Sequence, residues 1–184
     1  RRDRCRLPGP EESPAAGDDL THPPALRPAR LDECATLDDI CFRSKAYWGY
    51  DADFMESVRD QIRVDPEAVL AGRVWVAVDS DDHACGVIEI DLMDDATADL
   101  TLLFVDPDHM RKGLGRRLYA KALDLARDLG ARHLVIDSDP QAAAFYASMG
   151  AARTGSEPTG YQGRLLPKFC VAITDAALHT RCGI

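Results

Sequence analysis

The sequence predicts an α/β domain built on a mixed β-sheet, and two observations carry this prediction. Three apolar segments at 74–78, 86–92 and 100–105 follow one another through short polar turns, which is typical of an antiparallel meander. A one-faced helical pattern at 113–129 and a short apolar strand at 133–136 come next. A strand, a helix and a strand in this order form a βαβ crossover, so we expect a parallel strand pair beside the meander.

The length and composition fit a single domain. The chain has 184 residues, of which 46% are hydrophobic and 29% charged, enough for one globular core. Residues 1–23 hold four prolines and few apolar side chains. They are predicted to form a flexible arm, because little burial offsets the entropy of ordering them. We expect the folded domain at 24–176 and a C-terminal tail at 177–184.

Two helices are predicted before the meander. Residues 26–30 fit a short first strand, and apolar residues at spacings of three and four predict a helix at 31–42. A second helical pattern begins at Asp51, which suits an N-cap, and Pro66 lies just beyond its end. Its apolar face consists of Phe54, Met55, Val58 and Ile62.

The helix at 113–129 is the clearest in the chain. Its apolar face is predicted to consist of Leu114, Leu118, Leu125 and Leu129. Gly130 stands where a C-terminal glycine is expected. A shorter helix is predicted at 141–149, and closing strands at 151–155 and 165–173 flank the turn-rich segment GSEPTGYQG, which suits a loop over a site.

The charge and the cysteines argue against several classes of protein. With 22 Lys and Arg against 31 Asp and Glu, the net charge of −9 opposes binding to nucleic acid or to an anionic membrane. No window approaches the roughly 20 apolar residues of a membrane helix, and the residues shown contain no secretory signal, so a cytoplasmic location is expected. The six cysteines form no CxxC pair and the five histidines lie apart, so no metal is expected.

One local basic segment stands out in this acidic chain. The sequence HMRKGLGRRL, at 109–118, joins the third meander strand to the long helix. Glycines at a helix N-terminus allow backbone N–H groups to approach an anion, and the arginines and lysine add charge. The segment matches neither a dinucleotide-binding fingerprint nor a P-loop. The candidate phosphate-binding residues are Arg111, Lys112, Gly113, Leu114, Gly115 and Arg116.

Two motifs resemble the GNAT superfamily of acetyl-CoA-dependent N-acetyltransferases. LLFVDPDHMRKGLGRRL at 102–118 is similar to the family's strand and pyrophosphate loop, and FYASMGA at 145–151 to its FYxxxGF segment. A bacterial subgroup is similar at RSKAYWGYD, at IDSDPQAAAFY, and at Gly163, Arg164, Leu166 and Pro167. The chain departs from the family pattern at Met110 and at Ala151. The resemblance implies a GNAT-like fold with a splayed central strand pair and acetyl-CoA as co-substrate, without a metal.

The resemblance also implies roles for residues beside the cofactor. The pantetheine arm would pair with the strand edge at Leu103, Phe104 and Val105, and an N–H near Phe104 would stabilise the oxyanion. Tyr146 would protonate the departing thiolate, whereas without the resemblance it reads as a packed aromatic with its hydroxyl at the surface. Asp99 is the candidate base; a solvated carboxylate, with water as the base, is the alternative.

The acceptor side is predicted less specifically. Trp48 and Tyr50 flank a glycine and either line an acceptor pocket or pack in the core. Arg164 either orients a substrate carboxylate or pairs with an acidic side chain. The implied reaction is acetyl transfer to a primary amine of a small molecule or peptide by direct attack in a ternary complex. The alternative is a non-catalytic acyl-CoA-binding regulatory module. Because C-terminal strands in this family often pair between subunits, a homodimer is a possible assembly.

Overall fold

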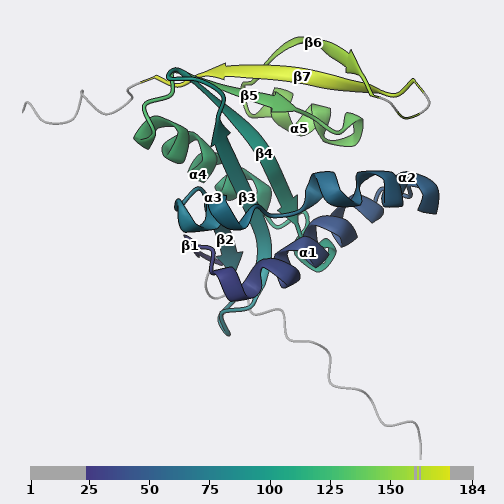
Figure 1. Cartoon of the computed structure of the whole chain (residues 1–184), viewed down its shortest axis with the longest axis vertical. Helices are drawn as coiled ribbons and strands as arrows, with labels where there is room; N and C mark the ends of the chain where they lie inside the picture. The colour runs from purple at the N-terminus through teal and green to yellow at the C-terminus, as the bar shows by residue number, and fades with distance from the viewer. Residues whose placement is uncertain (1–23, 160, 162, 175–184) are drawn as a thin grey trace, which may run out of the picture.

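The computed structural model describes residues 24–159, 161 and 163–174. The predicted arm at 1–23 and tail at 177–184 lie outside the described residues. Seven strands form one sheet in the order β1-β2-β3-β4-β5-β7-β6 (Figure 1). The strands are β1 (Ala25–Pro28), β2 (Val74–Val78), β3 (Ala84–Leu92), β4 (Thr97–Val105), β5 (His133–Asp137), β6 (Ala152–Pro158) and β7 (Leu165–Ala172).

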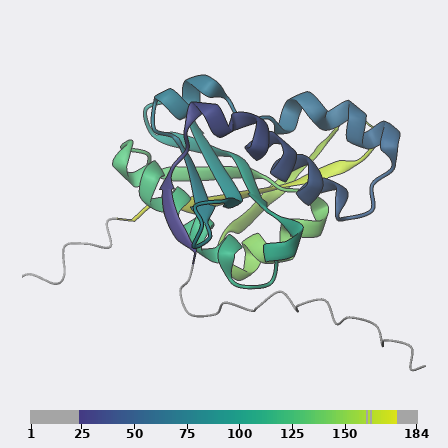
Figure 2. The ribbon, with the colours of Figure 1, turned by 90° about the horizontal axis from the view of Figure 1, so that it is seen from below.

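Helices cover both faces of the sheet. The helices α1, α2 and α3 lie on one face and α4 on the other, as the turned view shows (Figure 2). The α-helices are α1 (Cys34–Ala46), α2 (Ala52–Val58), α3 (Pro66–Leu70), α4 (Leu114–Asp128) and α5 (Ala143–Ser148). Short 3-10 turns are at Leu31–Glu33, Arg59–Ile62, Pro107–His109 and Pro140–Ala142. The predicted α/β class with its mixed sheet is confirmed.

The meander and the crossover both form as the apolar patterns predict. The strands β2, β3 and β4 pair antiparallel, and β4 pairs parallel with β5 after α4. The Asp51 side chain caps α2 by accepting the Phe54 N–H at 2.8 Å. At the outer edge of the sheet, every residue of β6 is exposed. Pairing of this strand between subunits stays a prediction.

Some details differ from the predictions. The helix α3 was not predicted; Asp65 caps it and Pro66 starts it, so this proline begins a helix instead of following one. The strand β4 begins at Thr97, three residues earlier than expected, because its first part pairs with both neighbours. Leu129 is 38% exposed, since α4 ends before it, so its predicted place on the buried face is wrong.

The parallel pair β4–β5 separates soon after it begins. Its pairing covers only Thr97–Asp99 of β4 against His133–Val135 of β5. Beyond this point β4 continues to Val105 along β3 alone, while β5 continues along β7. The expected splay is therefore present, and among the described residues no strand pairs with this edge of β4 beyond Asp99.

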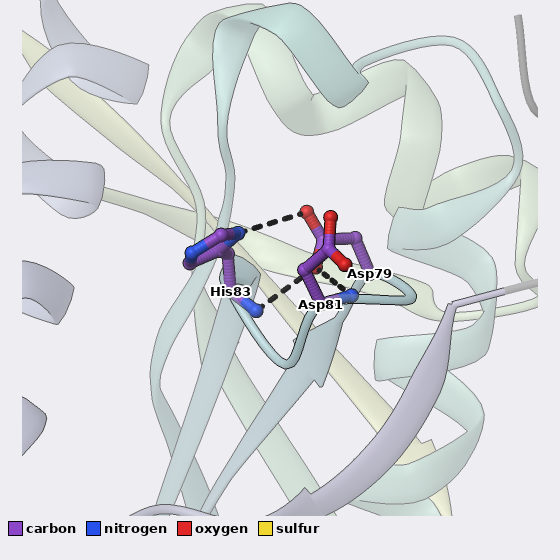
Figure 3. A group of neighbouring side chains, drawn as sticks. All are labelled: Asp79, Asp81 and His83. Atoms are coloured by element: carbon purple, nitrogen blue, oxygen red, sulfur yellow. Dashed lines mark hydrogen bonds and ion pairs between the residues drawn. The ribbon is translucent and has the colours of Figure 1, made fainter.

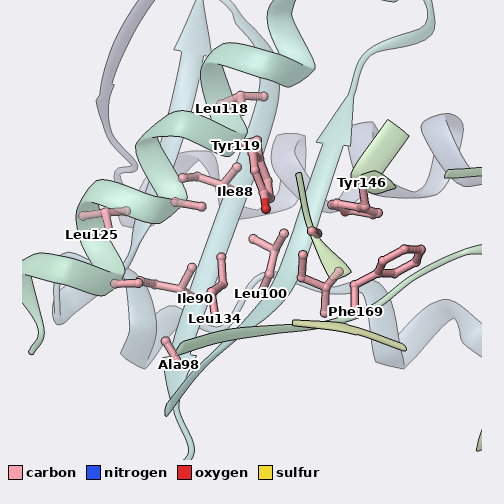
Figure 4. Packing of buried hydrophobic residues seen from close by; sticks show 14 of the residues in the cluster. Ile88, Ile90, Ala98, Leu100, Leu118, Tyr119, Leu125, Leu134, Tyr146 and Phe169 are labelled. Carbon is pink, nitrogen blue, oxygen red and sulfur yellow. The ribbon is translucent and has the colours of Figure 1, made fainter. Parts of the chain in front are cut away.

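Two apolar cores hold the sheet between its helices. The core under α4 includes Leu118, Tyr119, Ile88 and Leu134, and Tyr146 from α5 packs into it (Figure 4). The second core lies under α1 and α3. Because α4 contacts four strands that include both splayed ones, its N-terminus is held against the open edge of β4.

Gly86 allows α4 and β4 to approach β3 closely. A Cβ at this position would lie 2.9 Å from Leu118 Cδ1 and 3.0 Å from the Phe104 carbonyl oxygen. We therefore expect Gly86→Ala to lower the free energy of unfolding by about 1–3 kcal/mol. Gly155→Ala on exposed β6 is the matched control, because nothing lies within 4 Å of its added Cβ. Equal urea midpoints for the two variants would contradict this expectation.

Candidate active site

A cavity of about 1180 Å³ lies along the open edge of β4. Its walls come from the end of α1, from α2, from the loop before α4, from α5 and from the β6–β7 hairpin. The predicted site residues that line it are Trp48, Leu103, Phe104, Val105, Arg111, Gly113, Gly115, Arg116, Tyr146 and Arg164. Tyr50, Asp99, Lys112 and Leu114 are outside the lining.

The open edge of β4 presents alternate backbone groups to the cavity. The Asp106 N–H donates to the Cys85 carbonyl on β3 at 2.9 Å. In an antiparallel ladder the bonded pairs recur every two residues, so Phe104, opposite Val87, also directs its N–H toward β3. The N–H groups of Leu103 and Val105 point the other way, toward the splay. The edge donors are therefore at these two residues, so the N–H expected near Phe104 belongs to one of them and not to Phe104 itself.

The loop before α4 forms a concave backbone turn. Arg111 and Gly113 both have positive φ, of 62° and 80°, and α4 begins directly afterwards at Leu114. Positive φ is uncommon for a residue with a side chain, so the loop is held in a specific shape at Arg111. The first N–H groups of a helix have no acceptor within the helix. The loop thus directs unpaired donors and the positive end of the α4 dipole toward the cavity.

The two loop glycines leave room for a ligand. An added Cβ at Gly113 would meet nothing within 4 Å, and one at Gly115 would meet the Phe145 ring only at 3.7 Å. The protein's own packing therefore does not require glycine at 115. Close approach of a phosphate group to the backbone would require it. Together with the charges of Arg111 and Arg116, this cradle fits the pyrophosphate of acetyl-CoA.

An ion pair attaches the loop to α1. Asp106 is buried, accepts the Asp108 N–H at 3.0 Å and receives Arg43 Nη2 from α1 at 2.7 Å. The carboxylate therefore caps the 3-10 turn that leads into the loop. It also connects this turn to α1, which lies on the face of the sheet opposite α4. These contacts fix the path of the chain between β4 and α4.

Tyr146 lies at the cavity wall and is only 6% exposed. Its ring packs against Phe145, Tyr119 and Phe169. Burial raises the pKa of the Tyr146 hydroxyl, and the neighbouring Tyr119 and Asp139 act in the same direction. The phenol is therefore protonated at neutral pH and is available as a donor to the cavity. The packed ring is common to both interpretations of Tyr146, so its role as proton donor stays a prediction.

Asp99 is not brought to the cavity. It is half-buried where β4 still pairs with β3 and β5, opposite Asp91 and Val135. Burial raises the pKa of its carboxyl, and the nearby Asp137 adds to the shift. The carboxylates that do line the cavity are Asp137, Asp139 and Glu157. The interpretation of Asp99 as the base is therefore not supported by its position, because Asp99 lies in the paired part of β4 and the strand lines the cavity from Leu100 onward.

Asp139 is the centre of a polar cluster on the acceptor side. Its Oδ2 lies 2.6 Å from Lys45 Nζ and 2.9 Å from Arg164 Nη2. Its Oδ1 accepts the Tyr50 hydroxyl at 2.7 Å and the Gln141 N–H at 2.9 Å. Burial alone would raise the pKa of Asp139, but the contacts with Lys45 outweigh it and hold the pKa below its usual range. Three segments far apart in the sequence, 45–50, 139–141 and 164, meet at this carboxylate.

Aromatic rings surround this cluster. The guanidinium of Arg164 lies 4.5 Å from the ring centres of both Tyr50 and Phe54, and Phe54 packs edge-on against Tyr161. Tyr50 is outside the cavity lining, and its hydroxyl donates to Asp139. Trp48 lines the cavity and is 42% exposed. Tyr50 and Arg164 are thus brought into direct contact, at 2.7 Å. Arg164 satisfies the acidic-partner interpretation, with Asp139 as the partner.

Sequence reasoning missed Lys45, Phe54 and Asp139 as site residues. Lys45 and Asp139 lie within the segments RSKAYWGYD and IDSDPQAAAFY that carry the subgroup resemblance. The charged residues in these two segments were the feature of the sequence that could have indicated the polar cluster. Phe54 was assigned to the apolar face of a helix, and it is buried there as well as lining the cavity.

Substitution of Asp139 tests how much the polar cluster stabilises the fold. Asp139→Asn leaves Lys45 and Arg164 buried without their counter-charge, so we expect the free energy of unfolding to fall by about 2–4 kcal/mol at pH 7. Asp139 has a depressed pKa, so its contribution is complete above the unfolded-state pKa of about 4 and is lost as the pH falls further. The difference from wild type should shrink in acid. Asp124→Asn, at an exposed pair with Arg127, is the control in the same urea titrations and should change stability little.

A group of possible metal ligands at the β2–β3 turn has a local explanation. Oxygen and nitrogen atoms of Asp79, Asp81 and His83 lie within 4.8 Å of one another (Figure 3). Asp79 Oδ1 accepts the N–H groups of Asp81 and His83, each at 2.9 Å. The carboxylate is therefore used to close the turn, and the group is not part of the cavity.

A splayed parallel pair and a glycine-containing loop at the start of α4 are features that the resemblance implies for an acetyl-CoA-dependent transferase. The sequence matches the Acetyltransferase (GNAT) family over residues 33–151. The chain belongs to this family, and at the level of the family the predicted enzyme class, an N-acetyltransferase, is confirmed. Among the described residues, no helix is both long and apolar enough to span a membrane.

Individual relatives cover different parts of the chain. It is 33% identical over 114 residues to N-acetyltransferase 8 of Homo sapiens. The matched region covers 58% of this chain and 45% of that protein. The chain is 33% identical over 118 residues to the peptidyl-lysine N-acetyltransferase YjaB of Salmonella typhimurium, covering 64% and 72%. The chain thus spans less than half the length of the human relative. The structure of yncA from Salmonella typhimurium with its cofactor acetyl-CoA has a TM-score of 0.61 at 23% identity, covering 86% and 99%, and it supports the fold.

Proposed function

We propose that the chain transfers an acetyl group from acetyl-CoA to a primary amine of a small molecule or peptide, by direct attack in a ternary complex. The observation that carries this proposal is the continuity of one cavity from the loop at Gly113, along the open edge of β4, to Tyr146 and the Asp139 cluster. An anion cradle, an extended backbone edge, a proton donor and an acceptor pocket follow one another in the order that a thioester cofactor and an amine require. The family relationship supports the same reaction.

The cofactor is assigned to the loop and to β4. The N–H groups at the start of α4, with Arg111 and Arg116, hold the pyrophosphate. The pantetheine arm lies beside β4 and pairs with the backbone at Leu103 and Val105. The thioester carbonyl then receives an N–H from the same edge, which stabilises negative charge on its oxygen.

The chemical step involves one proton donor of the protein. The amine lone pair attacks the thioester carbon, and the carbon–sulfur bond breaks as the carbonyl re-forms. The thiolate of coenzyme A takes the proton of the Tyr146 hydroxyl, the acylated nitrogen loses a proton to water in the open cavity, and the Tyr146 phenolate regains a proton from this water. Water replaces Asp99 in this scheme, because Asp99 is not among the lining residues.

Calorimetric titration with acetyl-CoA tests the proposal. We expect binding in the micromolar range, followed by release of free thiol when amines are added. Absence of binding to the intact protein would contradict the proposal. Binding without thiol release, across amines of several classes, would instead favour the acyl-CoA-binding regulatory module.

A further inference from the structure

We propose that the acceptor amine also carries a carboxylate, as a free amino acid does, and that Arg164 and Lys45 bind this carboxylate. The inference rests on the proposed function and names the class of its second substrate. Both side chains line the cavity, on the side away from the phosphate cradle. Their contacts, their remaining hydrogen-bond donors and their net charge carry the argument.

Asp139 can accept no further hydrogen bond from Lys45 or Arg164. A carboxylate offers about four lone-pair sites, and Asp139 already accepts from four groups. Oδ1 receives the Tyr50 hydroxyl and the Gln141 N–H, and Oδ2 receives Lys45 and Arg164. Any further donor on Lys45 or Arg164 needs a different acceptor.

Donors remain on both cations. The guanidinium of Arg164 has five N–H groups; within the described residues its hydrogen bonds come from Nη2 alone, to Tyr50 and Asp139. Nε and Nη1 make none there. Lys45 has three ammonium protons, and within the same residues its hydrogen bonds involve Asp139 only. The site therefore has several unpaired, charge-bearing donors beside the cavity, which suits a planar oxyanion.

The charges of the cluster also leave one positive charge uncompensated. Lys45, Arg164 and Asp139 have side chains only 11%, 15% and 13% exposed, and together they carry two positive charges and one negative. Within the described residues, the other lining carboxylates, Asp137 and Glu157, form ion pairs with Lys168 and none with Lys45 or Arg164. A substrate carboxylate would balance the cluster where water screens it little.

The cluster is held in place before any substrate arrives. Arg164 is packed over the rings of Tyr50 and Phe54, and Tyr161 from the same hairpin donates to Asp51 at 3.1 Å. The guanidinium therefore has little freedom to lose on binding. Phe54 and Tyr161 supply apolar surface for the rest of an acceptor of amino-acid size.

The test compares amino acids with their uncharged amides. The probes are free α-amino acids and ω-amino acids of two to six carbons, each measured against its own amide, with acetyl-CoA and detection of free thiol. We expect the best acid to exceed its amide by at least about tenfold in kcat/KM. Arg164→Gln should lower kcat/KM for that acid by about 10- to 100-fold, mainly through KM, and change it for the amide by less than about threefold.

Two further variants separate recognition from folding. Arg164→Lys keeps the charge but loses the planar fork, so it should recover only part of the preference for the acid. Arg63→Gln, at an exposed pair with Asp38 outside the cavity, is the control and should leave the preference unchanged. The inference is overturned if no acid is a better acceptor than its amide, or if Arg164→Gln lowers both forms equally. Acetyl-CoA titration of the same samples reports separately on the proposed function.

Discussion

Gly113→Asp is expected to weaken acetyl-CoA binding by about 100-fold or more. The added carboxylate would stand at the cradle, where a negative charge a few ångströms from a pyrophosphate costs several kcal/mol even at an effective dielectric constant of about 20. Its negative charge would also offset the positive end of the α4 dipole, which attracts the pyrophosphate. The effect should appear as a loss of heat in calorimetric titration.

Gly113→Asn is the matched variant for this experiment. Asn and Asp have the same shape and both tolerate positive φ better than other side chains, which matters because Gly113 has a φ of 80°. The structure offers an added Cβ free space in either case. We therefore expect Asn to keep most of the affinity that Asp abolishes. Equal losses of affinity in the two variants would show that strain or bulk matters more than charge. Unchanged affinity in both would show that the pyrophosphate does not bind at this loop.

Tyr146→Phe is expected to lower kcat by about 100-fold or more and to leave acetyl-CoA affinity nearly unchanged. The change removes only the hydroxyl, so the packing of the ring against Phe145 and Phe169 is retained. Loss of a positioned general acid typically costs 10²- to 10⁴-fold. Because burial raises the pKa of this phenol, wild-type activity should not fall from its ionisation at mildly alkaline pH. Steady-state rates of thiol release from pH 6 to 9 measure both effects.

Tyr119→Phe provides a neighbouring control. Tyr119 is fully buried, is in contact with Tyr146, and lies outside the cavity lining. Its hydroxyl is buried without a hydrogen-bond partner among the described residues, so its removal should leave turnover unchanged and leave stability equal or slightly higher. If Tyr119→Phe slowed turnover as much as Tyr146→Phe, the effect would come from the aromatic cluster and not from a proton donor at Tyr146.

The parts of the fold that the sequence predicted are those with strong local patterns. Alternating and continuous apolar runs identified β2, β3 and β4, and the spacing of Leu114, Leu118 and Leu125 identified α4. The parallel pairing of β4 with β5 followed from the order of these elements alone. The helix α3 was missed because it is five residues long, too short for a periodic pattern to develop.

The candidate site also consists of a part that a local sequence pattern predicts and a part that only tertiary packing brings together. The loop and the strand edge that line one end of the cavity are contiguous in sequence, so one motif predicted them together. In the Asp139 cluster, Tyr50 and Arg164 form a hydrogen bond across 114 positions, and nothing local in the sequence brings Lys45 to Asp139. Asp99 was chosen for its place at the start of a strand, but which edge of a strand is free depends on where its neighbour departs, and that is set by tertiary packing.

The early separation of β5 from β4 also bears on aggregation. Unpaired backbone groups on an outer strand are a template for other chains, and proteins usually shield such edges. Here the unpaired edge beyond Asp99 lines the cavity, whose other walls include α1, α2 and α5. The walls of the cavity therefore shield these backbone groups from strands of other chains, as a covering helix or loop shields an outer strand.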